Sequence, residues 1–195
     1  MRLFVAVILS SDNQRRLRAP IDQLVQAHTD VLRATPDGML HLTLAFMGRV
    51  GAQDVAAVDE AIHQAAQQHS PFSIVLAAPR ILRARQDPRL VLLPVVDGAG
   101  PWEALARDLH RAIAARLPSL DLSPARSAHV TLARFRKHAR APDARAVEQS
   151  LTQAGVASLE LHDEVRDLRL FESLLTAAGP HYEERLTAPL KVSGS

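Results

Sequence analysis

The chain has 195 residues, which suits one domain or two small halves that share an interface. Hydrophobic residues make up 47% of it, which is enough for a sizeable core and argues against global disorder. There is no cysteine, which excludes disulfides, thiolate metal sites and thiol nucleophiles. The formal net charge is only +2, but nearly all cationic residues are arginine, a bias that either genomic base composition or an anionic ligand would explain.

The first expected element is a buried strand, because residues 3–9 form an apolar run. This run is too short to span a bilayer, which takes about 20 apolar residues. The polar segment that follows it lacks the small-residue cleavage site of a secretory signal. We therefore expect a cytoplasmic protein that has no membrane partner.

The predicted elements then follow in the same order twice. After the opening strand, the first half has a helix over about 12–28, a strand from His41, a helix over about 53–68 and strands over 72–76 and 80–83. The second half begins with a strand at Arg89 and continues with a helix over about 101–117, a strand from His129, a helix over about 142–154 and strands over 158–162 and 168–171. This series is typical of an α+β fold in which helices cover one face of each sheet.

The sequence also repeats residue by residue. His41-Leu-Thr-Leu-Ala-Phe returns 88 residues later as His129-Val-Thr-Leu-Ala-Arg-Phe, and Arg2-Leu-Phe-Val-Ala-Val returns in similar form 87 residues later from Arg89. We therefore predict a single domain over 1–195 with an internal repeat of about 1–87 and 88–175. Its two pseudo-symmetric lobes would each have a mostly antiparallel sheet with helices on the outer face, and an active-site cleft would lie between them.

The repeated His-x-Thr pattern predicts a chemical site. In a strand, residues i and i+2 point to the same face, so His41 projects with Thr43 and His129 with Thr131. Two such strands at a cleft would present two imidazoles and two hydroxyls to one ligand. This set suits a phosphodiester, because histidine takes and gives protons near neutral pH, hydroxyls bond the non-bridging oxygens, and a nearby arginine offsets charge on phosphorus.

A structural explanation competes with this chemical one. One His-x-Thr in a strand is usually a core or edge feature, since a histidine among apolar neighbours commonly has a satisfied hydrogen bond. Two copies in register with a repeat of the whole chain favour function, because histidine is a poor choice for filling a core. A module that binds nucleotide or RNA without turning it over remains an alternative, although such a descendant would be expected to lose one histidine.

The motifs resemble those of the two-histidine phosphoesterase superfamily, and within it the RNA 2′,3′-cyclic phosphodiesterases of bacteria and archaea, also described as 2′-5′ RNA ligases. The resemblance covers nearly the full length. It includes the opening strand, both His-x-Thr motifs, Leu170-Phe-Glu-Ser and Gly179-Pro-His-Tyr182-Glu.

This resemblance implies that the terminal 2′,3′-cyclic phosphate of an RNA is opened to a 2′-phosphomonoester without metal. His41 would be the proton donor and His129 the proton acceptor, and the substrate-binding candidates are Arg134, Phe46 and Tyr182. Phe46 adjoins its motif, where a phenylalanine is more often a core residue than a base-stacking one. We expect no cofactor and no metal, because the remaining histidines lack metal-binding spacing.

The expected partners are RNA ends or cyclic nucleotides, bound by a monomer. Two basic clusters could follow an RNA backbone, although a solvated surface explains the first equally well: Arg80, Arg83, Arg85 and Arg89, and Arg134, Arg136, Lys137, Arg140 and Arg145. Two alternatives keep the site and change the reaction, namely 2′-5′ RNA ligation and hydrolysis of a small cyclic nucleotide. Only product analysis separates them, since the same histidines serve both directions of the reaction.

Overall fold

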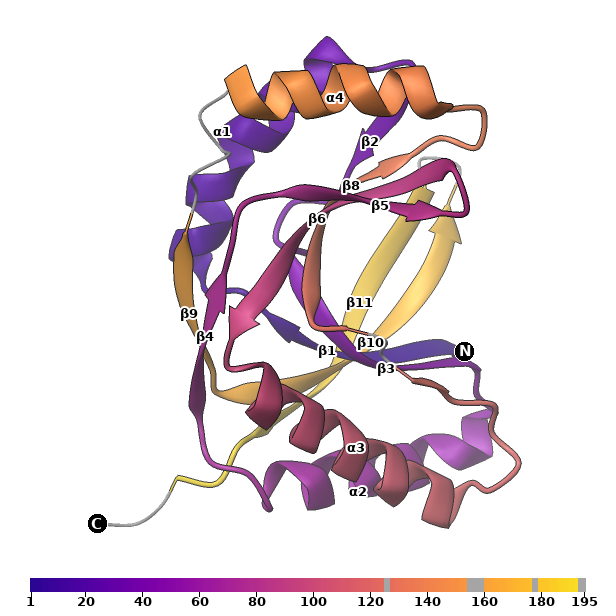
Figure 1. Cartoon of the computed structure of the whole chain (residues 1–195). Helices are drawn as coiled ribbons and strands as arrows, with labels where there is room; N and C mark the ends of the chain where they lie inside the picture. Colours follow the sequence, from indigo (N-terminus) through magenta and orange to yellow (C-terminus); the bar gives the residue numbers. More distant parts are fainter. Residues whose placement is uncertain (125–126, 154–159, 177–178, 193–195) are drawn as a thin grey trace.

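The computed structural model describes residues 1–124, 127–153, 160–176 and 179–192, and within these ranges the chain forms a curled antiparallel sheet with four α-helices (Figure 1). The helices are α1 (Ser11–Ala27), α2 (Val55–Ala66), α3 (Ala99–Arg116) and α4 (Ala141–Gln153), with a short 3₁₀ helix η1 at Ala52–Asp54. The strands are β1 (Arg2–Ile8), β2 (Leu32–Ala34), β3 (His41–Arg49), β4 (Phe72–Leu76), β5 (Arg80–Ala84), β6 (Asp87–Asp97), β7 (Ser123–Pro124), β8 (His129–Phe135), β9 (Leu161–Val165), β10 (Asp167–Thr176) and β11 (Gly179–Pro189).

The strand order is β11-β10-β1-β3-β8-β6-β4-β9, with β2 added to β8, β5 to β6 and β7 to β3. One part of the sheet is built from β11, β10, β1 and β3, the other from β8, β6, β5 and β2. The two parts meet where β3 pairs with β8. The α+β fold class expected from the sequence is confirmed, and the strands of both parts belong to one continuous sheet.

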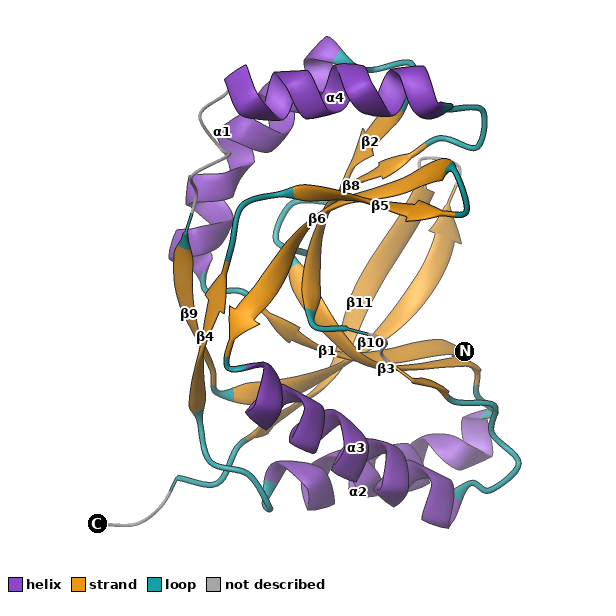
Figure 2. Ribbon diagram, viewed as in Figure 1, coloured by secondary structure: helices purple, strands orange, loops and turns teal. Residues whose placement is uncertain are grey.

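The helices and short strands are exchanged between the two halves of the sequence. α1 and α4 pack together over β2, β5, β6 and β8, whereas α2 and α3 pack together against β3, β10 and β11 (Figure 2). Each helix layer therefore takes one helix from each half. In the same way β2 of the first half pairs with β8, and β7 of the second half pairs with β3. The internal repeat stays a prediction, and this reciprocal exchange is compatible with it.

Local sequence explains where two of the helices begin. α1 starts after Ser10, whose side chain accepts a hydrogen bond from the Asn13 N–H at 3.4 Å. α3 starts after Gly98, whose φ of +77° is left-handed. A Cβ at this position would lie 2.3 Å from the Ser73 carbonyl oxygen, so that only glycine fits. Pro101 then falls in the first turn, where its missing N–H costs little.

The structure differs from the predicted elements at several places. β11 was not predicted, because its side chains are mostly polar and exposed, as an edge strand allows. β2 and β7 are too short to give a periodic signal. The strand predicted over 158–162 is observed at Leu161–Val165, and residues 158–159 lie outside the described residues. In the described part of the chain, no helix combines the length and apolarity needed to cross a membrane.

Candidate active site

The two His-x-Thr motifs lie next to each other at the centre of the sheet. Leu42 of β3 pairs with Val130 of β8, and both side chains are fully buried in the core. Because side chains alternate along a strand, the neighbouring motif residues project from the opposite face. The antiparallel register at this pair brings His41 to the same side as Thr131, and Thr43 to the same side as His129.

Both histidine rings are held in the same way by the backbone. His41 Nδ1 lies 2.7 Å from the Met39 carbonyl oxygen, and His129 Nδ1 lies 2.9 Å from the Ser127 carbonyl oxygen. A carbonyl oxygen only accepts, so each Nδ1 carries the hydrogen and donates it. In the neutral ring this leaves Nε2 with its lone pair. Each motif therefore fixes one tautomer through the carbonyl two residues earlier and presents Nε2 for proton transfer.

The electrostatic surroundings lower the pKa of both histidines. Burial is the largest cause for His41, and the positive charges of Arg134 and His129 act in the same direction. Burial is also the largest cause for His129, followed by Arg134 and Arg80. The two backbone hydrogen bonds oppose these effects. Both rings are thus biased toward the neutral form, and an anion bound between them would favour the protonated form again.

Arg134 is the cation common to both histidines. Its guanidinium has no ion pair with a carboxylate in the described ranges, so its charge is available to a ligand. Thr131 is nearly buried and Thr43 is half-buried. Next to them, the buried Thr35 donates its hydroxyl to the Thr131 carbonyl oxygen at 2.7 Å, which fixes β8 beside β2.

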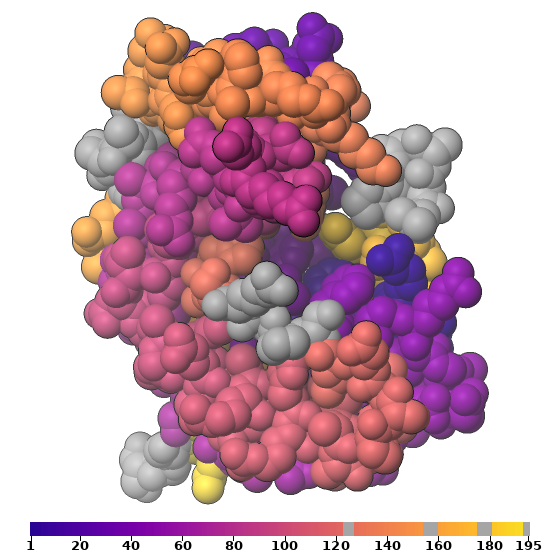
Figure 3. Space-filling view, turned by 45° about the vertical axis from the view of Figure 1, so that its right-hand side comes forward, coloured from indigo at the N-terminus to yellow at the C-terminus, as the bar shows by residue number. Residues whose placement is uncertain are grey.

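The middle of the molecule is hollowed between the two helix layers (Figure 3). Two cavities, of about 380 and 220 Å³, share His41, Arg134 and Tyr182 as lining residues. The larger one extends along β2 and β8 and includes Thr35 and Thr131. The smaller one is also lined by Arg2, Phe4, Thr43, Phe46 and Ser173. His129 lines neither cavity, and its positive charge contributes to the lowered pKa of His41.

Aromatic rings enclose one side of His41. The Phe4 ring lies 5.4 Å from the His41 ring, measured between centroids, and Tyr182 meets Phe4 edge-on at 5.2 Å and His41 at 6.2 Å. Phe46 is 37% exposed, and the Arg2 guanidinium lies 5.8 Å from its ring centroid. Tyr182 and Phe46, the two aromatic candidates from the sequence, therefore both lie at the candidate site, although their contact with substrate stays a prediction.

Phe4 and Thr35 are site residues that sequence analysis missed. Phe4 belongs to the opening strand, which was recognised only as a buried run. Its register opposite Phe46 and Phe171 brings it next to the motif face, and strand alternation alone does not give that register. Thr35 follows the short β2 and belongs to no motif, so that no sequence signal pointed to it.

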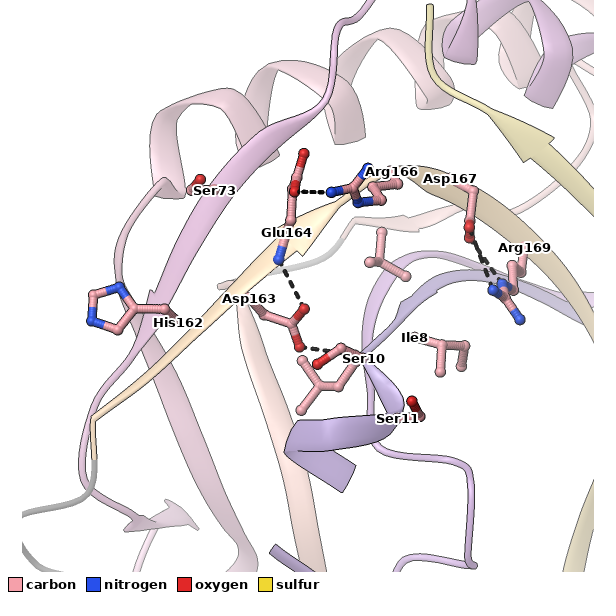
Figure 4. A pocket seen from close by; sticks show the side chains of 12 residues that line it. Ile8, Ser10, Ser11, Ser73, His162, Asp163, Glu164, Arg166, Asp167 and Arg169 are labelled. Carbon is pink, nitrogen blue, oxygen red and sulfur yellow. Dashed lines mark hydrogen bonds and ion pairs between the residues drawn. The ribbon is translucent and has the colours of Figure 1, made fainter. Parts of the chain in front are cut away.

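A larger cavity, of about 700 Å³, lies elsewhere, beside the end of β1, the start of α1 and β9 (Figure 4). Its arginines are already neutralised, Arg166 by Glu164 and Arg169 by Asp167. A third carboxylate, that of Asp163, accepts a hydrogen bond from Ser10 N at 2.9 Å. A phosphate would meet paired cations and additional negative charge there. The two cavities at Arg134 therefore suit an anion better than this larger one.

The remaining polar clusters do not form a second site of this kind. The described residues contain no group of three or more histidine, aspartate and glutamate side chains placed to hold a metal. Of the first basic cluster, Arg83 pairs with Glu148 and Arg89 with Asp87. The second cluster is divided, since Arg134, Arg136 and Lys137 line the 380 Å³ cavity whereas Arg140 and Arg145 do not.

Comparison with known proteins agrees with this geometry. A sequence model of the 2′-5′ RNA ligase superfamily matches residues 13–173. An RNA 2′,3′-cyclic phosphodiesterase of Archaeoglobus fulgidus is 27% identical over 186 residues, which cover 94% of this chain and 97% of the relative. A protein of the same name from Aeropyrum pernix is 30% identical over 161 residues, which cover 80% of this chain and 86% of the relative.

Solved structures show the same fold. TT0787 of Thermus thermophilus aligns with a TM-score of 0.75 at 23% identity, covering 97% of this chain and 98% of that one. LigT of E. coli aligns with a TM-score of 0.69 at 21% identity, covering 98% of both chains.

Proposed function

This chain belongs to the 2′-5′ RNA ligase superfamily, and we propose that it opens the terminal 2′,3′-cyclic phosphate of RNA to a 2′-phosphomonoester. The proposal depends on one observation above all. Two histidines present the same ring nitrogen on one face of the sheet, beside an arginine that no carboxylate neutralises within the described residues. The relatives named RNA 2′,3′-cyclic phosphodiesterase support the choice of substrate.

In the proposed reaction, water attacks the phosphorus while the bond between phosphorus and O3′ breaks. His129 Nε2 accepts the proton of the attacking water, and protonated His41 donates from Nε2 to the leaving O3′. The products are a 2′-phosphomonoester and a 3′-hydroxyl. His41 must enter protonated, although burial lowers its pKa, and the negative charge of the bound substrate supplies the opposing effect.

The distribution of the two roles rests on the family resemblance, because both pKa values are shifted in the same direction. A substrate in which sulfur replaces the bridging O3′ tests it, since a thiolate leaves without a proton. We expect this substrate to restore much of the activity of His41→Ala and little of the activity of His129→Ala. Restoration of His129→Ala instead would reverse the two roles.

The other site residues bind and stabilise the phosphate in this proposal. Thr43 and Thr131 donate hydrogen bonds to the non-bridging oxygens, and Arg134 stabilises the charge that grows on them in the transition state. Tyr182 and Phe46 contact nucleosides next to the reacting phosphate. The positions of these residues support the proposed roles, since Arg134 and Tyr182 line both cavities and Phe46 lines the smaller one.

We propose that the reaction needs no metal, because histidines and an arginine supply the proton transfers and the positive charge. The experiment is hydrolysis of a short RNA that ends in 2′,3′-cyclic phosphate, in EDTA, with the product phosphate assigned by phosphorus NMR. A 2′-phosphate formed at an unchanged rate in EDTA supports the proposal. Binding of the RNA without turnover would leave the nucleic-acid-binding alternative. Cell fractionation and size-exclusion chromatography test the expected cytoplasmic location and monomeric state.

Ligation to a 2′-5′ linkage is a second candidate, and the smaller cavity favours it. This cavity lies on the Phe46 side of Arg134 and would accept a second nucleoside, whose 5′-hydroxyl takes the place of water. Both histidines keep the same roles, because His129 accepts the proton of the attacking 5′-hydroxyl while the P–O3′ bond breaks and His41 protonates O3′. Adding an excess of RNA with a 5′-hydroxyl should yield a joined product that resists ribonucleases specific for 3′-5′ linkages.

A further inference from the structure

The 380 Å³ cavity continues beyond the residues that the proposed reaction uses. One end is formed by His41 and Thr131, and the lining reaches Arg136 and Lys137, which follow the end of β8. Arg136 lies five residues after Thr131. At about 3.3 Å per residue of extended chain, the two Cα atoms are about 16 Å apart along the chain. A cyclic phosphate between His41 and Thr131 would leave the lining at Arg136 and Lys137 to the rest of a longer ligand.

We propose that this cavity binds the RNA chain just before its cyclic end, with Arg136 and Lys137 contacting a backbone phosphate. This inference rests on the proposed function and makes it more specific: the preferred substrate is an oligonucleotide, and a cyclic mononucleotide is a poor one. Arg136 and Lys137 are then specificity-determining residues that bind the substrate away from the reacting phosphorus.

The charges along the cavity support a polyanionic ligand. Its lining includes four cationic side chains and no carboxylate: Arg33, Arg134, Arg136 and Lys137. Arg33 lies opposite Arg134 in the pairing of β2 with β8, so the two guanidinium groups start from neighbouring positions. The formal charge of the whole chain is only +2, so such a concentration of positive charge is local. Without a carboxylate in the lining, phosphates are the natural counterions of Arg134, Arg136 and Lys137.

Arg136 is also held in place before any ligand binds. Its Nε donates to the Thr29 carbonyl oxygen at 3.2 Å, and its backbone N–H donates to the Val31 carbonyl oxygen at 2.8 Å. Both partners belong to the turn between α1 and β2. A guanidinium fixed on one edge keeps its remaining N–H groups for a ligand and loses less conformational entropy on binding. Lys137 next to it is exposed, and the long unbranched stem of a lysine suits a phosphate without demanding one geometry.

The apolar lining suits the sugar and base between phosphates. Ala34, Pro36 and Phe135 contribute carbon surface between the cationic residues. Phe135 is half-buried, and its backbone pairs with Leu32 of β2. This alternation of apolar and cationic surface matches a nucleotide chain, in which apolar faces of bases alternate with phosphates.

The test compares two substrates that share the reacting group, adenosine 2′,3′-cyclic phosphate and a trinucleotide with the same cyclic end. We expect kcat/KM at low salt to be at least about tenfold higher for the trinucleotide. In Lys137→Glu and Arg136→Gln this ratio should fall by about tenfold. Removal of one phosphate contact should also reduce the slope of log(kcat/KM) against log[salt] for the trinucleotide by about 0.7.

Arg145→Ala is the matched control, because Arg145 is an exposed cation on the neighbouring helix α4 and lies outside the cavity. It should keep the wild-type substrate ratio. The inference is overturned if kcat/KM is no higher for the trinucleotide than for the mononucleotide, or if Lys137→Glu lowers kcat/KM equally for both substrates. It is also overturned if Arg145→Ala lowers the substrate ratio as Lys137→Glu does. These results leave the proposed function intact. If neither substrate is opened, the proposed function itself fails and the inference falls with it.

Discussion

His41 and His129 begin equivalent strands and make equivalent backbone hydrogen bonds, yet their surroundings differ. The His41 ring packs against the Phe4 ring and meets the edge of Tyr182. The His129 ring has no aromatic contact in the described part of the chain, and its Nδ1 lies 3.5 Å from the Ser127 hydroxyl oxygen. The shared features arise within the repeated motif. The rings around His41 come from β1 and from β11, the last strand of the chain. The two motifs thus supply two similar groups, and rings from outside the motifs make their surroundings unequal.

The largest effect should come from removing either imidazole. We expect His41→Ala and His129→Ala each to lower kcat by about 10³-fold, because each removes one proton transfer. If the histidines act as a pair, the double variant should be about as slow as either single one. Single-turnover hydrolysis of the cyclic-ended RNA measures the rates of the two single variants and the double variant. Losses that multiply in the double variant would mean that the histidines act independently.

The next largest effect should come from Arg134, the cation that both histidines share. Arg134→Ala should lower kcat by about 10²-fold, through lost stabilisation of charge on the phosphate. It should also raise the pKa of both histidines, because the Arg134 charge lowers both. Steady-state kinetics and histidine NMR titrations measure the two effects. Arg107→Ala, at an exposed cation on α3, is the control, and an equal loss there would contradict a specific role.

Replacing the threonines tests whether the two motifs bind phosphate alike. Thr43→Val and Thr131→Val keep the side-chain shape and remove one hydrogen bond to a charged group, so each should lower kcat/KM by about tenfold. Thr152→Val, at an exposed site on α4, should leave kcat/KM unchanged. Variants that lose thermal stability and keep full activity would show that the hydroxyls are structural.

The smallest effect should come from the ring that makes the two histidines unequal. Phe4→Leu should lower kcat by about threefold, since an aromatic contact contributes about 1 kcal/mol. The NMR signals of the His41 ring should shift while those of His129 stay in place. Phe171→Leu is the matched control, because Phe171 stacks on Phe4 at 5.4 Å from the opposite strand. Equal shifts of His41 in both variants would mean that general loosening of the core is responsible.

Sequence alone could predict the parts of this site that depend on local geometry. Alternation along a strand gave the common face of His41 and Thr43, and helical periodicity gave the buried stripe of α1. The pairing of β3 with β8 is a contact between residues 88 positions apart, and only the repeat and the family resemblance pointed to it. Tyr182 comes from an edge strand whose polar residues hide its regular structure. The stacking of Phe4 on His41 depends on strand register, which periodicity does not specify.

The pH dependence of kcat/KM tests the paired acid–base mechanism most directly. Free enzyme must hold one protonated and one neutral histidine, and burial and Arg134 lower both pKa values from 6.5. We therefore predict a bell-shaped profile for the cyclic-ended RNA, with two apparent ionisations and a maximum below pH 6.5. The residual activity of His41→Ala should rise with pH to a plateau, and that of His129→Ala should fall with rising pH. A wild-type profile that is flat between about pH 5 and 8, or variants that both keep the full bell, would contradict the account.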